Sequence, residues 1–176
     1  MILLLTFVCA ACSIVFSQEA QKPATLRYKV PAGWVEEERS SSMRVAQYKL
    51  PRNGGDTEDA SLVLYYFGKG QGGTAAANVE RWASQMQQPD GSKTKITEET
   101  FIVNGLKVTT VDGAGNYVAE TAPGSGEFLN KPGFRLRAAV IETPNGSYYV
   151  KLVGPEKTVT HWNEAFVAYL KSFEFK

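Results

Sequence analysis

The chain has 176 residues, of which 43% are hydrophobic and 21% are charged, as in an ordinary globular protein. Its 19 basic and 18 acidic side chains leave a formal net charge of +1. This balance excludes the basic electrostatic footprint of a nucleic-acid-binding protein, so we expect no nucleic-acid partner.

Residues 1–17 form an almost unbroken apolar stretch without a charged side chain. The stretch is shorter than the roughly 20 residues needed to cross a bilayer. Polar residues follow from Gln18, and branched and small side chains stand at the −3 and −1 positions of a cleavage after Ser17. We predict a secretion signal over 1–17, a short disordered N-terminus over 18–24 and one domain over 25–176. No basic residue precedes the apolar run, so a permanent membrane anchor is kept as an alternative.

Both cysteines, Cys9 and Cys12, lie in this apolar segment. The sequence Cys9-Ala10-Ala11-Cys12 is similar to the site at which bacterial lipoproteins are cleaved and acylated. Lipidation would attach the protein to a membrane through Cys12, but residues 14–16 would then remain as an apolar stub. Cleavage after Ser17 would leave a mature chain without cysteine or disulfide. Both routes predict an exported protein of the periplasm or cell envelope. Lipidation of Cys12 would make it an outer-membrane lipoprotein.

The first half of the domain predicts strands at residues 26–30, 43–50 and 61–67. The third of these is apolar on both faces, which is typical of a central strand that is covered on both sides. A glycine loop then leads to a helix, for which Thr74 is the expected N-cap. Its apolar positions recur at helical spacing: Ala75, Val79, Trp82 and Met86.

Two hairpins and a helix are predicted in the second half. Asn104-Gly105 suits a two-residue turn between strands at 96–103 and 106–111. Pro144-Asn145-Gly146 suits a three-residue loop between strands at 134–143 and 147–153. The last helix begins near Pro155, and residues 172–175 suit a short edge strand. Together these elements predict an α+β fold, a mostly antiparallel sheet packed with two main helices.

The loop at residues 68–73 matches the pattern G-x-G-x-x-G between a strand and a helix. Such a loop can direct backbone amides and a helix N-terminus at a phosphate, and Lys69 could add charge. The neighbouring hairpins and the missing ribose-binding acid argue against a dinucleotide fold, and a plain connection between the two elements is the alternative. The candidate anion-binding residues are Gly68, Lys69, Gly70 and Gly73.

A second candidate site is a basic sheet face. Arg135 and Arg137 project from one side of their strand, and the predicted register places Lys151 on the same side of the partner strand. These three residues could bind an anion or a protein partner. They could equally be solvated side chains that extend past a covering helix.

The usual catalytic and metal-binding patterns are absent from the sequence. His161 is the only histidine, and no nucleophile-elbow sequence accompanies it. One histidine and no mature cysteine cannot form a His/Cys metal site. Asp56, Glu58 and Asp59 could hold calcium weakly, but their spacing does not match an EF-hand. We expect no enzyme activity, no cofactor and no metal site.

The order of elements resembles the PsbP-like fold, which includes a photosystem II extrinsic subunit, a Ran-binding import factor and DcrB-like bacterial envelope proteins. The resemblance spans residues 25–176 and depends on the turn 31–34, the helical segment 78–82 and the dipeptide Ser172-Phe173. It implies a non-enzymatic role in assembly, binding or envelope maintenance, and it transfers no functional residue.

These observations predict an exported accessory or binding protein of the bacterial envelope that acts by contact with a protein partner. The alternative is a periplasmic protein that binds a small ligand or anion through the 68–73 loop or the Arg135/Arg137/Lys151 face.

Overall fold

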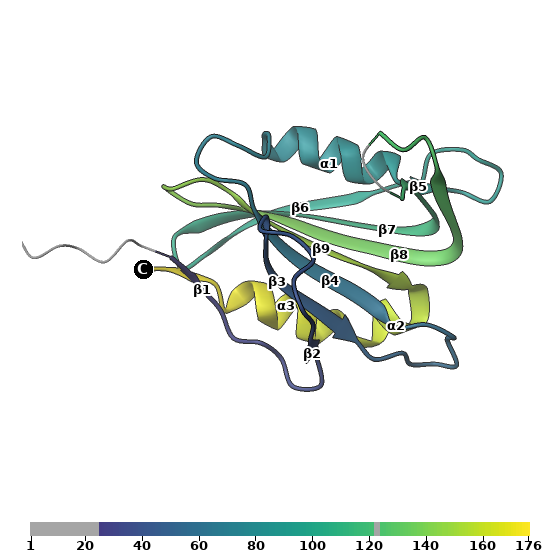
Figure 1. Cartoon of the computed structure of the whole chain (residues 1–176), viewed down its shortest axis with the longest axis horizontal. Coiled ribbons are helices and arrows are strands. Elements are labelled where there is room, and N and C mark those ends of the chain that lie inside the picture. The colour runs from purple at the N-terminus through teal and green to yellow at the C-terminus, as the bar shows by residue number, and fades with distance from the viewer. Residues whose placement is uncertain (1–24, 122–123) are drawn as a thin grey trace, which may run out of the picture.

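The computed structural model describes residues 25–121 and 124–176. The predictions for the secretion signal, for lipidation of Cys12 and for residues 18–24 lie outside the described residues. Helix α1 lies across one side of a large twisted sheet, and helices α2 and α3 lie across the other (Figure 1). The elements are β1 Leu26–Arg27, β2 Val35–Glu36, β3 Arg44–Leu50, β4 Ala60–Tyr66, α1 Ala75–Ser84, β5 Met86–Gln87, β6 Thr97–Val103, β7 Leu106–Glu120, β8 Phe128–Glu142, β9 Tyr148–Pro155, α2 Glu156–His161, α3 Asn163–Lys171 and β10 Glu174–Phe175.

The main sheet is antiparallel throughout the described residues. Its strand order is β2-β3-β4-β9-β8-β7, and β5 and β6 both pair with β7. A separate small ladder joins the two ends of the domain, with Leu26 opposite Phe175. The predicted α+β class is therefore confirmed. The predicted first strand is much shorter than expected, since only Leu26 and Arg27 pair as a strand.

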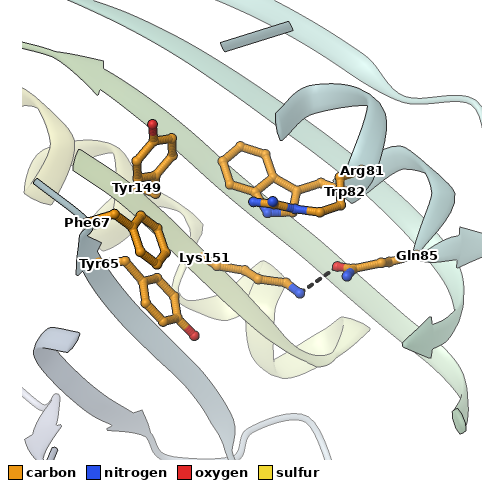
Figure 2. A pocket seen from close by; sticks show the side chains of 7 residues that line it. All are labelled: Tyr65, Phe67, Arg81, Trp82, Gln85, Tyr149 and Lys151. Carbon is orange, nitrogen blue, oxygen red and sulfur yellow. Dashed lines mark hydrogen bonds between the residues drawn. The ribbon is translucent and has the colours of Figure 1, made fainter. Parts of the chain in front are cut away.

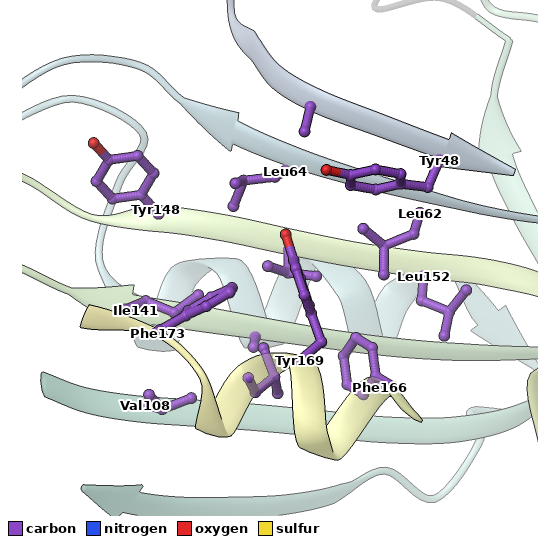
Figure 3. Packing of buried hydrophobic residues seen from close by; sticks show 14 of the residues in the cluster. Tyr48, Leu62, Leu64, Val108, Ile141, Tyr148, Leu152, Phe166, Tyr169 and Phe173 are labelled. Carbon is purple, nitrogen blue, oxygen red and sulfur yellow. The ribbon is translucent and has the colours of Figure 1, made fainter. Parts of the chain in front are cut away.

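The larger core lies between the sheet and helices α2 and α3 (Figure 3). Period-two alternation directs Leu62 and Leu64 of β4 toward these helices, and their partners Leu152 and Val150 of β9 point the same way. The helices fill the space above them with side chains that are almost fully buried. These are Val159, Phe166, Tyr169 and Leu170, joined by Phe173 behind α3.

The smaller core lies under α1. Thr74 caps this helix as predicted, because its hydroxyl accepts from the Ala77 amide at 3.2 Å. Trp82 enters the core from α1 together with Met86 of β5, and both are buried. The helix was predicted to include Met86, but it ends at Ser84 and Met86 pairs with Tyr117 of β7. The helix packs chiefly against β5, β7 and β8.

The two hairpins differ in how well the sequence predicted them. Asn104 and Gly105 both have positive φ, of 48° and 80°, and Val103 pairs with Leu106 as predicted. In the β8–β9 hairpin, Val140 pairs with Tyr149 and not with the following residue. The predicted three-residue loop is wrong, because the Gly146 amide closes a tighter turn on the Thr143 carbonyl at 3.1 Å.

The apolar pattern could not set that register. Residues 138–141 are all fully buried, on both sides of the sheet, so sliding β9 by one residue still covers apolar side chains. A slip of one residue exchanges the two faces of a strand. The side chains of β9 therefore lie on the other side of the sheet from the side that the predicted register gives them relative to β8.

The predicted last helix is two helices, α2 and α3, which meet at Trp162. The indole of Trp162 donates to the Pro51 carbonyl at 2.9 Å, which ties this break to the end of β3. The Asp56 carboxylate accepts from both the amide (2.8 Å) and the hydroxyl (2.7 Å) of Thr158 in the first turn of α2. The polar loop that contains Asp56 therefore holds the start of α2.

Candidate functional site

The α1 side of the sheet is covered over only part of its width. Helix α1 packs chiefly against β5, β7 and β8. Beside it lies a concave cavity of about 740 Å³, which is lined by residues of β3, β4, β7, β8 and β9. Ligand sites usually measure about 300–1,000 Å³. We call this concave surface the open face. Its floor and walls include Val63, Tyr65, Tyr117, Phe134, Lys151 and Val153.

A smaller pocket of about 150 Å³ adjoins the open face beside α1 (Figure 2). Arg81 and Trp82 of the helix and its C-cap residue Gln85 form one wall. Aromatic side chains of β4 and β9 form the other, and Lys151 extends between the two walls (Figure 2). The two cavities are continuous, because both are lined by Tyr65, Phe67, Gln85 and Lys151.

Lys151 is a cation whose partners are neutral. Its amine donates to Gln85 Oε1 at 2.5 Å and to the Tyr117 hydroxyl at 2.9 Å. Among the described residues, no ion pair includes it. Burial, and secondarily the nearby charge of Arg81, lower the pKa of Lys151 to about 8. At pH 7 the amine is still mostly protonated, so the pocket contains a positive charge that no carboxylate within residues 25–121 and 124–176 pairs with.

Arg81 brings a second positive charge to the same pocket. It lies on the exposed side of α1 and donates to the side-chain oxygen of Asn78, one turn earlier on the helix. Asn78 is buried and is itself held by the carbonyls of Gly72 and Thr74, at 2.8 and 2.9 Å. The guanidinium is therefore positioned by a neutral amide that is anchored to the glycine loop.

Aromatic rings form the apolar part of the site. Tyr65 and Phe67 stack with their centroids 5.9 Å apart, and Phe67 lies 5.5 Å from Tyr149. Further along the open face, Tyr117 stacks on Phe134 at 6.4 Å. Burial raises the pKa of Tyr117 to about 12, so its hydroxyl stays neutral beside Lys151. The site thus offers flat apolar surfaces on both sides of one partly buried amine.

The glycine loop lies directly behind this pocket. The Tyr149 hydroxyl donates to the carbonyls of Gly73 (2.8 Å) and Gln71 (3.2 Å). Four of its glycines, Gly68, Gly70, Gly72 and Gly73, have positive φ, which explains the glycine pattern by backbone conformation. Lys69 and Gly70 are exposed. Because carbonyls of the loop face the described site, anion binding by its amides stays a prediction.

The predicted basic face is divided between the two sides of the sheet. Arg135 bonds both Asp112 oxygens, at 2.8 and 2.6 Å, on the side that carries α2 and α3. Arg137 lies there too, hydrogen-bonded to Asn163 and 4.9 Å from the centre of the Phe166 ring. Lys151 pairs with Ala138 on the α1 side. The expectation of one Arg135/Arg137/Lys151 face was wrong, because it depended on the register that the β8–β9 turn does not adopt.

The other polar candidates have structural partners. His161 is exposed and packs edge-on to Trp162, 4.9 Å between centroids. Asp59 accepts from the Arg52 amide at 2.8 Å, and Glu58 pairs with Lys131 at 3.1 Å. Within residues 25–121 and 124–176, no group of three His, Cys, Asp or Glu side chains is arranged to hold a metal ion. The same residues contain no helix long and apolar enough to span a bilayer.

Three residues of the site were not singled out from the sequence. Arg81 lies in the last turn of α1 and Gln85 is its C-cap, four positions later, which puts both on one side of the helix. Tyr117 lies in the part of β7 that extends beyond the predicted strand end at residue 111. The helical spacing of Arg81 and Gln85 was a usable signal. No local sequence pattern identified Tyr117 as a site residue. Its position depends on the length of the β7–β8 hairpin, which was not predicted.

Comparisons with known proteins show similarity in fold but no matching family or sequence. No family model matches this chain, and no curated protein matches its sequence. The structure is similar to that of LpqN of Mycobacterium tuberculosis, a protein involved in cell envelope biogenesis, with a TM-score of 0.54 and 10% identity over 90% of this chain and 87% of that one.

It is also similar to PA94 of Pseudomonas aeruginosa, a protein of unknown function, with a TM-score of 0.50 and 17% identity over 86% of this chain and 96% of that one. Identities this low show a shared fold and no more. The PsbP-like resemblance stays a prediction.

Proposed function

We propose that this chain is an exported binding protein of the cell envelope, without catalysis of its own, that holds an amphiphilic ligand on the open face. The observation that carries the proposal is the uncovered half of the sheet. It forms a cavity of about 740 Å³ in which aromatic and branched apolar side chains surround the partly buried amine of Lys151, while polar and charged side chains such as Arg44, Glu58 and Glu120 complete the lining. An apolar concavity with few polar groups is the usual form of a small-ligand site.

The envelope location is supported by two independent observations. The apolar segment 1–17 predicts export. The fold is shared with LpqN, a protein involved in envelope biogenesis. The absence of a catalytic pattern in the sequence supports a role in binding rather than in chemistry.

The test uses N-phenyl-1-naphthylamine, a neutral naphthalene dye whose fluorescence rises in apolar surroundings. The purified protein should bind the dye, and Val153→Gln on the open face should weaken that binding. Ile102→Gln is the matched control, because Ile102 is a branched residue on β6 that is 67% exposed and lines neither cavity. If the wild-type protein does not raise the dye's fluorescence, or if the two substitutions weaken dye binding equally, a ligand site on the open face is refuted.

A protein partner is a second candidate, favoured by one observation. Phe128 and Leu129, at the far end of the β7–β8 hairpin, are 61% and 38% exposed, and Leu129 also lines the open face. Adjacent exposed apolar residues on a rim are a common feature of contact surfaces. A photoreactive residue at position 128 should crosslink to one partner in the native envelope, and the purified pair should re-form the complex. The same residue at position 102 should not crosslink to that partner.

A further inference from the structure

We propose that the small pocket beside α1 is a subsite for the anionic head group of an amphiphile, with Arg81 and Lys151 as its two cationic ligands. This inference rests on the proposed function, and it adds the chemical class of the ligand. The head group is an oxyanion, such as a carboxylate, sulfonate or phosphate monoester. The apolar body attached to it lies on the open face.

The first argument for this subsite is the charge of the residues that line the pocket. Seven residues line it, and two of them, Arg81 and Lys151, are cationic whereas none is acidic. Both cations are hydrogen-bonded only to neutral groups among the described residues: Asn78 for Arg81, and Gln85 and Tyr117 for Lys151. Burying a charge without a counter-charge costs free energy, and this cost falls on Lys151, because Arg81 is exposed. An anion in the pocket supplies the missing counter-charge for Lys151 and an ionic partner for Arg81.

The second argument is the volume of the pocket. A cavity of about 150 Å³ is comparable to engineered apolar cavities that accept a benzene molecule. The pocket therefore has room for a compact head group, and not for a nucleotide. Because it opens into the larger cavity through Tyr65, Phe67, Gln85 and Lys151, a longer body can continue outward.

The distribution of charge along the open face orients the ligand. Acidic residues line the open face but not the small pocket, namely Glu58, Asp59 and Glu120. Among the described residues, Glu58 pairs with Lys131, and Arg44 is the other cation of the open face outside the small pocket. The head group is therefore attracted to the small pocket, which is lined by two cations and no carboxylate. The open face therefore favours one direction of binding.

The experiment compares two dyes that differ by one charged group. 8-Anilinonaphthalene-1-sulfonate has the same aromatic skeleton as N-phenyl-1-naphthylamine and carries a sulfonate in addition. The wild-type protein should bind the sulfonate dye more tightly than the neutral dye. Lys151→Met and Arg81→Gln should each weaken binding of the sulfonate dye by about fivefold or more, since a charged hydrogen bond is lost. Neither variant should weaken binding of the neutral dye.

Matched variants control for charge and folding. Lys171→Met on α3 and Arg27→Gln on β1 remove exposed cations that line neither cavity, and they should leave both dyes unaffected. Lys151→Arg keeps the charge and should retain binding of the sulfonate dye. A cooperative thermal transition in each variant confirms that the domain is folded.

Two outcomes would contradict the inference, and they differ in what else they contradict. If both dyes bind and the Lys151 and Arg81 variants affect neither or both equally, the head-group subsite is wrong while the ligand site on the open face stands. If neither dye binds the wild-type protein, both the subsite and the proposed function are wrong.

Discussion

The Lys151 amine donates to the Tyr117 hydroxyl at 2.9 Å and lies 5.0 Å from the centre of the same ring. Both contacts help to hold a cation, but neither supplies a negative charge. The protein therefore keeps a protonated amine partly buried beside neutral partners. Such arrangements lower stability and are typical of sites that bind or react. This relationship leads to the first prediction.

Replacing Lys151 with Met should stabilise the protein at pH 7. Folding lowers the pKa of Lys151 from 10.5 to about 8, because burial disfavours the charged form. The charged groups and phenols around the amine are Arg81 of α1, Tyr65 of β4, Tyr117 of β7 and Tyr149 of β9. Each unit of pKa corresponds to about 1.4 kcal/mol, so the buried charge costs about 3 kcal/mol at pH 7. Loss of the hydrogen bonds to Gln85 and Tyr117 offsets about 1 kcal/mol of this, so we expect a gain on the order of 2 kcal/mol in the free energy of unfolding.

The stabilisation expected for Lys151→Met depends on pH in a defined direction. Below pH 8 the amine is protonated in both states, and the full cost of burying its charge is present. Between about pH 8 and 10.5 the unfolded state binds more protons than the folded state, so the wild-type protein becomes more stable as pH rises. Urea unfolding from pH 7 to 10.5 should show the advantage of Lys151→Met shrinking. An advantage that is constant with pH, or a similar gain in Lys171→Met, would contradict the charge explanation.

Tyr169→Phe should leave stability unchanged or raise it by about 1 kcal/mol. The Tyr169 hydroxyl is buried in the α3 core and has no hydrogen-bond partner among the described residues. Removing it eliminates an unsatisfied polar group, while the ring keeps its edge contacts with Tyr28 and Phe173. Thermal or urea unfolding measures the change.

Tyr149→Phe is the matched contrast, because the Tyr149 hydroxyl donates to the carbonyls of Gly73 and Gln71. This variant should be destabilised by about 1–2 kcal/mol. Equal effects of the two substitutions would show that the hydroxyl contacts do not determine the difference.

Gly72→Ala should destabilise the domain more than Gly70→Ala. Both glycines have positive φ, of 86° and 74°, so both substitutions incur backbone strain of about 1 kcal/mol. A Cβ on Gly72 would also lie 2.6 Å from the Tyr149 ring, whereas a Cβ on Gly70 would meet nothing within 4 Å. The difference between the two variants in urea unfolding isolates the contact with Tyr149. Equal losses would mean that the loop moves away from Tyr149 without cost.

The N-terminus of the exported protein distinguishes the two routes to the envelope. Cleavage after Ser17 predicts a soluble protein whose first residue is Gln18. Lipidation predicts a chain that begins at Cys12 with the added mass of acyl groups, and Cys12→Ser would release it from the membrane. Mass spectrometry of protein recovered from the envelope measures either product. An intact segment 1–17 would contradict both routes and support an uncleaved anchor.

Local patterns were sufficient for much of the fold. Asn104-Gly105 determined its hairpin because only a short turn with two positive φ values suits that dipeptide. Thr74 marked the start of α1 through a contact three residues away. The apolar character of residues 61–67 on both faces also identified β4 as a central strand, and it lies between β3 and β9.

The candidate site was less accessible, because it depends on non-local geometry. The side of the sheet on which Lys151 lies is set by the one-residue register of β9, and buried residues on both faces made that register ambiguous. The open face exists because α1 packs chiefly against β5, β7 and β8 and covers only one part of the sheet. No property of Val63 or Val153 in the sequence indicates that a helix fails to cover them.

The central place of β4 beside β9 also governs the order in which the site can form during folding. Each hairpin joins neighbouring segments, but the β4–β9 ladder pairs residues roughly 80 to 90 positions apart, as in Tyr65 opposite Tyr149. Such a pairing closes a long loop and forms slowly compared with a hairpin. Tyr65 and Lys151 meet only through this ladder. During refolding, the ability to bind a naphthalene dye at the native site should therefore appear in the last kinetic phase, together with the complete sheet.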